Sequence, residues 1–570
     1  MSDRYAFESS SASQVPEEPY KSKQYSYIQD TNNSQNPTQL KFTLDGFRSN
    51  DKFVSPSEMY LQIPLVLAAS GTAANGFVNT ALLNSAGAAA MKAGYWNLIQ
   101  SMSVMLDNKE VVQITPNTNF YSCFKFATSA SLDDVASLGG TLGYAKDDST
   151  SWQWRSAVSA CGIGLCNNTA GQTNWTSTTA TSNLVFYGAD GNAGLWRRLQ
   201  MDSAYSASTG KWSAIKSVAN FQNELKNYVG IGAARDATDY MVKYISAVIR
   251  LRDISDLFEK LPLCRGFNAT LTINLNVGNV SITKSASLTG DLTIAGLSVS
   301  NNGTLPFTVN KYGTAFDWLT TAGATASTVA VGVYYGSVRT SAVGSQTSLA
   351  IPANPQPIAR IYAPMIEMKP EFALSYLSES KQKLVVYRDL LYFNPAAVSA
   401  GGSFNIQLAP SINNMKGLLV IPMIASSANI VFGTAATEFQ SPFDTCPATT
   451  APLSIYNFNV QLSSQNVFQQ NIQYGYEQFI HETSGAYAVN GGIGALGINS
   501  GLIDFVDWDN IYKFYYVDLS RRLKDDNLGK SISLLGNNNN LLALDLHCFI
   551  EVEKSLIIDV ESGRVLELRV

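Results

Sequence analysis

Charged residues are scarce in this sequence, and histidine is almost absent. Asp, Glu, Lys and Arg make up 15% of the 570 residues, against roughly 25% in typical soluble proteins. The histidines are His481 and His547 alone, so a histidine-rich metal site or a Ser-His-Asp relay has little to draw on. Ser, Thr, Asn, Gln and Gly replace the missing charge, which is typical of β-rich proteins with many turns.

The sequence also lacks a basic tract and a long apolar run. Its net charge is −5, and residues 1–38 hold more acids than bases: Asp3, Glu8, Glu17, Glu18 and Asp30 against Arg4, Lys21 and Lys23. Because nucleic-acid binders usually present a basic patch, we expect no sequence-specific nucleic-acid binding. Without about 18 consecutive apolar residues, we expect no transmembrane segment. The polar opening Met1–Arg4 predicts no secretory signal.

Cysteine is sparse as well. We interpret the six cysteines as reduced core thiols of an intracellular chain: Cys123, Cys161, Cys166, Cys264, Cys446 and Cys548. Cys161 and Cys166 have no second pair nearby, which makes zinc binding a weak hypothesis.

A pattern that occurs twice is the strongest positive signal. Residues 99–106 alternate between apolar and polar up to Asp107-Asn108, and 455–462 do the same up to Ser463-Ser464, with aromatics following in both copies. A second pair of segments agrees in order: 248–252, Gly266 and the alternating 271–275 against 517–521, Gly536 and the alternating 542–546. Period-two alternation indicates strands, so the repeats predict one β domain used twice.

The domain organisation follows from these repeats. We predict a flexible N-terminal arm at 1–38, a first half at 39–370 and a second half at 371–570. The first half carries two low-charge insertions, at about 127–238 and 278–355. The first insertion contains five of the eight tryptophans, which predicts a small core of its own rather than a ligand-binding platform: Trp152, Trp154, Trp175, Trp196 and Trp212. Short helices are predicted at 253–261 and 467–481.

No motif in the sequence supports catalysis or cofactor binding. Gly492–Gly497 matches GxGxxG but lacks the strand before it and the helix after it. Gly529-Lys530-Ser531 lacks the first glycine of a phosphate loop, because position 524 is Lys524. His481-Glu482 begins like HExxH, yet the fifth residue is Gly485. Adjacent acids point to different sides and fit solvated turns: Asp133-Asp134, Asp147-Asp148 and Asp525-Asp526. We therefore predict a non-enzymatic protein with no catalytic, cofactor-binding or metal-binding residues.

Three strand-like segments carry a family resemblance: 97–111; 249–276; and 541–560, which contains Phe549-Ile550-Glu551-Val552-Glu553-Lys554. In this order they resemble the double jelly-roll major capsid proteins of virophages and polinton-like viruses. The likeness extends over about 40–570 and is strong in the strands, whereas the arm and the two insertions carry none of it.

The resemblance implies a mainly β protein of two tandem jelly-roll β-sandwiches, with the long inserted loops of the first forming an outer tower. It also implies homotrimers that act as pseudo-hexameric capsomers of an icosahedral shell around double-stranded DNA. Penton and minor capsid or cement proteins are the implied partners, and the virion is the implied location.

Two other functions stay open. A β-rich viral or cell-surface protein that binds a receptor or glycan fits the tryptophan cluster, and a secretory signal would favour it. A β-sandwich carbohydrate enzyme needs two acids that meet in space from distant positions, which a sequence alone does not reveal.

Overall fold

The computed structural model of the chain describes most of its strands and helices. The described residues are 19–32, 36, 38–49, 51–71, 88–147, 152–154, 184–186, 194, 197–198, 240–284, 292–310, 327–335, 340–343, 346–350, 358–379, 381–425, 454–485, 501–510, 512–520, 529–540 and 543–569.

Eight strands of the first half form two facing sheets. One sheet has the order β1-β18-β4-β10, and the other has the order β2-β11-β6-β7. Numbered along the chain from one to eight, these strands are ordered 1-8-3-6 and 2-7-4-5, which is the arrangement of a jelly roll. The strands are β1 (Tyr20–Gln29), β2 (Gln39–Thr43), β4 (Tyr60–Gly71), β6 (Ile99–Leu106), β7 (Lys109–Val112), β10 (Tyr240–Arg250), β11 (Ala269–Leu275) and β18 (Arg360–Met368).

The second half repeats this arrangement strand for strand. Its sheets have the orders β19-β26-β21-β24 and β20-β25-β22-β23, and β27 (Val565–Arg569) pairs with β26. The predicted double jelly roll is therefore confirmed. The strands are β19 (Gln382–Phe393), β20 (Ser403–Ile412), β21 (Met415–Ile424), β22 (Ile455–Leu462), β23 (Gln465–Asn466), β24 (Tyr515–Asp518), β25 (Lys530–Asn538) and β26 (Leu544–Asp559).

The first sequence repeat is confirmed as a pair of equivalent hairpins. Asp107 and Asn108 (φ 48° and 61°) join β6 to β7, and Ser463 and Ser464 (φ 47° and 72°) join β22 to β23. Two successive residues with positive φ form the tight turn that matches the twist of antiparallel strands. A helix follows each hairpin, α2 (Thr118–Ser129) in the first half and α9 (Tyr476–Gly485) in the second.

The prediction made from the second pair of sequence segments is only partly right. β10 and β24 do occupy equivalent places, at the end of their sheets beside β4 and β21. The counterpart of β11, however, is β25, which contains Gly536, and not the alternating 542–546, of which the residues from Leu544 onward begin β26. Both candidate strands alternate with period two, so alternation alone cannot select the equivalent one.

The predicted arm at 1–38 is wrong for Tyr20–Gln29. These residues form β1, which pairs with β18 along its whole length, from Tyr20 opposite Met368 to Gln29 opposite Arg360. Tyr, Lys, Ser and Gln fill β1, a composition that resembles disorder, but an edge strand is held mainly by its backbone hydrogen bonds. The first roll thus begins before residue 39, whereas residues 1–18 lie outside the described part of the chain.

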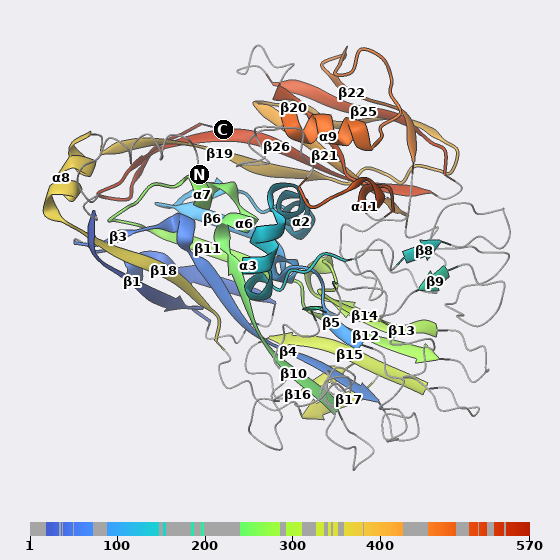
Figure 1. Cartoon of the computed structure of the whole chain (residues 1–570), viewed down its shortest axis with the longest axis horizontal. Helices are drawn as coiled ribbons and strands as arrows, with labels where there is room; N and C mark the ends of the chain where they lie inside the picture. The colour runs from blue at the N-terminus through green and yellow to red at the C-terminus, as the bar shows by residue number, and fades with distance from the viewer. Residues whose placement is uncertain are drawn as a thin grey trace.

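The second insertion continues the sheet of the first roll. At its first residues β4 pairs with β18, and from Leu65 to Gly71 it pairs with β15 (Ser327–Tyr335). β12 (Gly278–Lys284) and β13 (Leu292–Val299) then extend the sheet beyond β15 (Figure 1). Strand β4 of the roll therefore pairs directly with β15 of this insertion.

The first insertion contains a helix that the sequence pattern did not predict, α3 (Leu132–Leu142). Of its tryptophans, Trp152 and Trp154 lie in β8 (Trp152–Trp154), which pairs with β9 (Leu184–Phe186). The expected tryptophan core lies outside the described residues. The other short elements are η1 (Leu44–Phe47), β3 (Phe53–Val54), η2 (Pro56–Glu58), β5 (Ala88–Met91), η5 (Tyr95–Leu98), η9 (Ser300–Asn302), β14 (Phe307–Asn310), β16 (Thr340–Val343) and β17 (Gln346–Ala350).

The predicted helices need small corrections. The helix expected at 253–261 is two short helices, α6 (Leu251–Ile254) and α7 (Asp256–Lys260). The helix expected at 467–481 begins only at Tyr476, because Ile472 still forms a β-bridge with Phe458. α11 (Phe505–Asn510) packs against α9.

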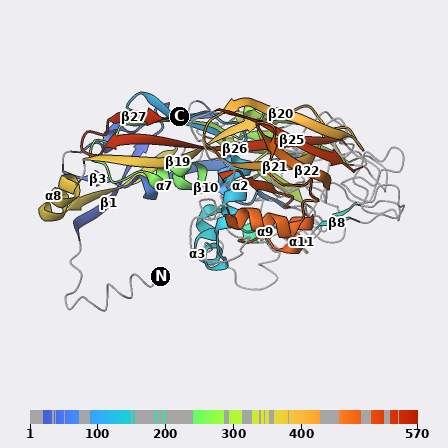
Figure 2. The same ribbon diagram turned by 90° about the horizontal axis from the view of Figure 1, so that it is seen from above.

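The two rolls lie side by side, joined at one end of the molecule by α8 (Pro370–Glu379) (Figures 1 and 2). α8 follows β18, the last strand of the first roll, and precedes β19, the first strand of the second. A continuous hydrophobic core runs through both rolls and includes Leu61 and Ile273 of the first and Leu418 and Ile550 of the second. We propose 371–570 as the second roll on the basis of this order.

Candidate functional site: the seam between the two rolls

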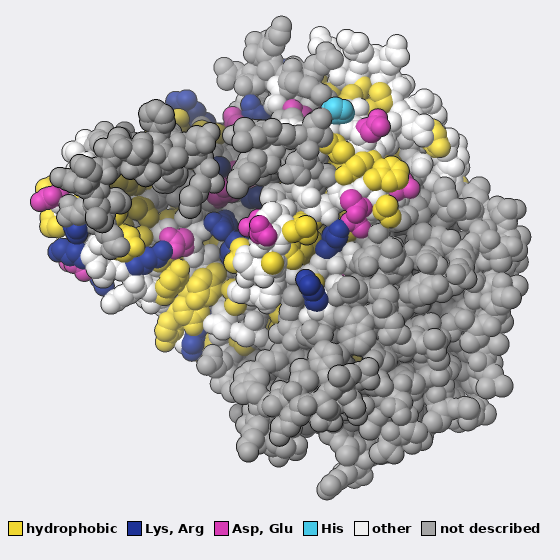
Figure 3. All heavy atoms as spheres, viewed as in Figure 1, with side chains coloured by type: hydrophobic (Ala, Val, Ile, Leu, Met, Phe, Trp, Pro, Cys, Tyr) yellow, Lys and Arg dark blue, Asp and Glu magenta, His cyan; other side chains and the backbone are white. Residues whose placement is uncertain are grey.

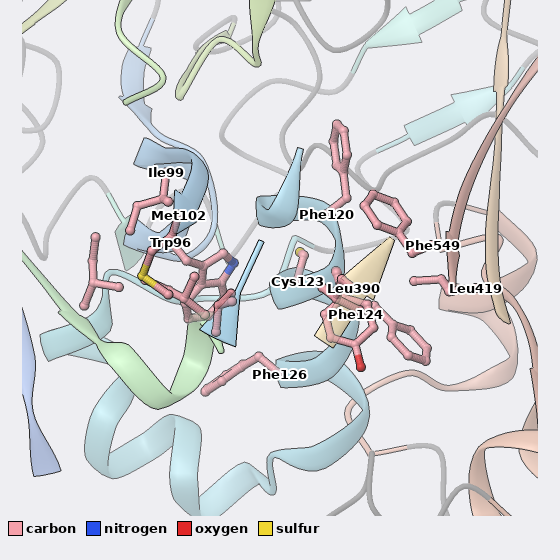
Figure 4. Packing of buried hydrophobic residues seen from close by; sticks show 14 of the residues in the cluster. Trp96, Ile99, Met102, Phe120, Cys123, Phe124, Phe126, Leu390, Leu419 and Phe549 are labelled. Atoms are coloured by element: carbon pink, nitrogen blue, oxygen red, sulfur yellow. The ribbon is translucent and has the colours of Figure 1, made fainter. Parts of the chain in front are cut away.

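Helix α2 of the first roll covers the outer face of the β19-β26-β21-β24 sheet of the second. The ring of Phe124 stacks on Tyr516 at 5.3 Å and meets Phe514 edge-on at 5.2 Å. The ring centres of Tyr121 and Phe549 lie 6.4 Å apart, and Figure 4 shows Phe120 and Phe124 on the side of α2 where Phe549 and Leu419 lie. Each aromatic pair of this kind adds about 0.5–1.5 kcal/mol beyond the area it buries. We call this contact between the rolls the seam.

A buried carboxylate lies at the centre of the seam. Glu551 on β26 is fully buried and accepts a hydrogen bond from the Tyr121 hydroxyl (2.8 Å) and another from the Tyr516 hydroxyl (3.3 Å). Arg388 on β19 forms an ion pair with the same carboxylate. Burial, reinforced by Glu551, raises the pKa of Tyr121 well above its usual value, so that its hydroxyl stays protonated as a donor. One side chain thus ties α2 to two strands of the second roll.

A second buried ion pair lies on the other face of β19. Lys554 donates to Asp389 at 2.6 Å, and both side chains are almost fully buried. The carboxylate of Asp389 also accepts from the backbone N–H of Gln113 (3.4 Å), just after β7. The hydroxyl of Thr115 donates to the carbonyl of Leu390 (2.6 Å). The chain after β7 therefore follows the edge of β19 that faces away from β26.

The backbones of the two rolls touch at two glycines. A Cβ added to Gly563, in the turn between β26 and β27, would lie 1.7 Å from the carbonyl oxygen of Gly266, and Gly563 has φ +71°. Beside them, the N–H of Arg265 donates to the carbonyl of Val560 at 2.8 Å. Only glycine permits this approach, because any side chain would push the rolls apart.

A small cavity lies in the seam. This cavity has a volume of about 30 Å³ and is lined in part by Tyr121, Lys125, Asp256 and Arg388. It has room for about one water molecule. Breaking one partner of a buried ion pair costs several kcal/mol, and such pairs serve best as devices that select one geometry. The arrangement is therefore suited to holding two rolls at one fixed angle.

Within the described parts of the chain, the weighed sequence motifs do not converge on a common site. His481 is exposed on α9, whereas Glu482 is buried and accepts from the N–H of Asp518 at 2.9 Å. Asp134 caps the first turn of α3 through Ser131, and Asp147 is buried against Arg198 at 2.6 Å. Lys530 begins β25. The other weighed positions lie outside the described residues: Gly492–Gly497, Cys161, Cys166, Asp148, Lys524 and Asp525-Asp526.

Among the described residues, no three His, Cys, Asp or Glu side chains converge in a way that could hold a metal ion. Three cysteines can be described, and as predicted they are buried free thiols: Cys123, Cys264 and Cys548. In the same part of the chain, no helix combines the length and apolar character needed to cross a membrane.

The sequence analysis assigned no role in a contact between the rolls to any residue of the seam, although a signal was present. Arg388-Asp389 interrupts the apolar stretch 384–393, and Glu551 interrupts 546–552. Charged residues inside an otherwise apolar strand indicate buried ion pairs, since an unpaired buried charge is strongly unfavourable. The pairing partners follow only from the register between β19 and β26, in which Asp389 stands opposite Val552.

Comparison with known proteins finds solved structures that have a similar fold. No family model and no curated protein sequence matches the chain. A chain in the cryo-EM structure of the Sputnik virophage is 11% identical, with a TM-score of 0.51, and the match covers 98% of this chain and 90% of that one. The mavirus major capsid protein is 10% identical (TM-score 0.46), with 99% and 94% covered. The chain therefore has the virophage-type double jelly-roll fold.

Proposed function

We propose that the chain is a viral major capsid protein that self-assembles as trimers. One observation carries the proposal: two rolls with the same strand order are fixed to each other by a buried seam. A rigid chain with two similar modules lets three copies present six similar edges, as hexagonal tiling requires. The fold shared with a chain of the Sputnik virophage supports the same function.

The finer parts of the proposal follow from the same architecture. Trimers tile as pseudo-hexamers into an icosahedral shell around a double-stranded DNA genome, so that the protein is located in the virion. Penton and minor capsid proteins close the shell where six-fold tiling cannot. The protein has no catalytic role, and its partners are chiefly copies of itself.

The mass of the purified chain tests the proposal. Size-exclusion chromatography with light scattering should give about 185 kDa, three times the 61.7 kDa of the chain. Negative-stain microscopy of concentrated protein should show hexagonal arrays or closed particles. A stable monomer that forms no lattice would contradict the proposal.

A further inference from the structure

The outer faces of the two equivalent sheets carry matching rows of side chains. In the second roll, the row across β19, β26, β21 and β24 is Tyr392, Phe549, Leu419 and Tyr516, as the strand registers show. In the first roll, the row across β1, β18, β4 and β10 is Tyr27, Tyr362, Tyr60 and Arg250. Tyr60 and Tyr362 stack at 4.9 Å, and Tyr25 lies 5.9 Å from Tyr60. We call Tyr25, Tyr27, Tyr60 and Tyr362 the tyrosine face.

The two rows differ in what covers them. Helix α2 lies over the row of the second roll and buries Phe549 and Tyr516 completely. On the tyrosine face, Tyr25 and Tyr27 remain 52% and 49% exposed. Figure 3 shows the apolar surface over β1 and β18 on this side of the molecule. An exposed cluster of aromatics is unusual on a soluble protein and typical of an interface.

The chain also carries a counterpart of α2, and within the part that the structure describes this helix packs on its own roll and on no sheet of the other roll. α9 follows the β22–β23 hairpin as α2 follows the β6–β7 hairpin. Beside α9, Phe505 and Val506 of α11 are 60% and 47% exposed. We call the exposed side chains of this surface the α9–α11 face: Glu477, His481, Asp504, Phe505, Val506 and Asp509.

The charges of the two faces are complementary. The α9–α11 face contains three acids, Glu477, Asp504 and Asp509. Asp509 already pairs with Lys513 at 2.7 Å, so Glu477 and Asp504 carry the charge that a neighbouring chain would meet. On the tyrosine face, the Arg360 guanidinium lies 4.7 Å from the centre of the Tyr27 ring, and its buried Nε has no hydrogen-bond partner in the part of the chain that the structure describes. Arg360 as a whole is half-buried, so a carboxylate of another chain that approaches the outer part of its guanidinium would form a charge-assisted hydrogen bond.

We propose, building on the proposed trimer, that the α9–α11 face of one copy docks on the tyrosine face of the next copy. The seam inside each chain is the model for this contact. There, helix α2, which follows the β6–β7 hairpin of the first roll, covers the outer aromatic row of the second roll. In the same way, the α9–α11 face on the second roll of one copy covers the tyrosine face on the first roll of its neighbour. Because these two surfaces differ, the copies join head to tail. A head-to-tail contact closes into a ring when the rotation fits, and three copies then alternate six rolls.

Paired variants test this surface. The double variant Tyr25→Ser/Tyr27→Ser removes the exposed tyrosines, and Phe505→Ser/Val506→Ser removes the apolar centre of the other face. Each should weaken the contact about 30-fold or more, as expected for aromatic anchors of an interface. Leu132→Ser on α3 is the matched control, since Leu132 is 79% exposed outside both faces.

Light scattering gives the readout at a concentration where the unmodified chain is trimeric. We expect about 61.7 kDa for each double variant and about 185 kDa for the control. Mixing the two double variants should produce a dimer of about 123 kDa, because each retains the face that the other lacks. Circular dichroism and thermal unfolding should show that all variants are folded, since every substituted side chain is about half exposed or more.

The outcomes separate the two proposals. A folded double variant that remains trimeric would overturn this surface and leave the proposed trimer standing. A monomeric unmodified chain would overturn the proposed trimer itself.

Discussion

Acid should destabilise the folded chain through a single buried histidine. His547 on β26 is 3% exposed, its Nδ1 lies 2.7 Å from the Tyr392 hydroxyl, and its ring stacks on Tyr392 at 6.0 Å. Phe120 of α2 lies 6.5 Å away, across the seam. Burial lowers the pKa of His547 from 6.5 to about 3.

The direction of the effect follows from the pH at which the unfolded and the folded chain each take up a proton on His547. The unfolded chain protonates this histidine near pH 6.5, whereas the folded chain keeps it neutral until about pH 3. Its contribution to stability is therefore complete above pH 6.5 and is lost as the pH falls toward 3. Between pH 7 and pH 5, the linked loss in the free energy of unfolding is about 2 kcal/mol.

Urea unfolding at pH 7 and pH 5, at one protein concentration, measures this loss. His547→Gln removes the titrating group and retains a hydrogen-bonding partner for Tyr392. The unmodified chain should lose about 2 kcal/mol more than the variant between the two pH values. His481→Gln is the control, because that side chain is exposed on α9, and it should behave as the unmodified chain does. An equal loss in the His547→Gln variant and the unmodified chain would refute the reasoning.

Two further substitutions probe the seam. Glu551→Gln leaves Arg388 without its carboxylate and should lower the free energy of unfolding by about 3–5 kcal/mol in urea, while Glu561→Gln, in an exposed pair with Lys381, should change it far less. Equal effects would show that the seam is not held by its charges. Gly563→Ala should lower the melting temperature well beyond Gly401→Ala: both glycines have positive φ, but a Cβ at Gly401 meets open space, whereas one at Gly563 meets the carbonyl of Gly266. Similar melting temperatures would contradict the close approach of the rolls.

Much of the fold could be predicted because its signals are local. The repeated pattern that ends in Asp107-Asn108 and in Ser463-Ser464 predicted one β domain used twice, and the structure has equivalent hairpins at both places. Alternation of apolar side chains reports which face of a strand is buried, and this depends only on neighbours along the chain. The duplication, and with it the double jelly roll, could therefore be inferred from the sequence.

The partners of strands and charges were decided by the tertiary structure. β1 has a composition that resembles a flexible arm, and only pairing with β18, more than 300 residues later, makes it a strand. Likewise, Glu551 gains its role from Tyr121, Arg388 and Tyr516, which lie on three other elements. Such contacts depend on register and on the packing of one roll against the other, and neither is encoded in a window of neighbouring residues. The sequence by itself determined that there are two rolls, and the packing between them decided how they are fixed and which faces remain exposed.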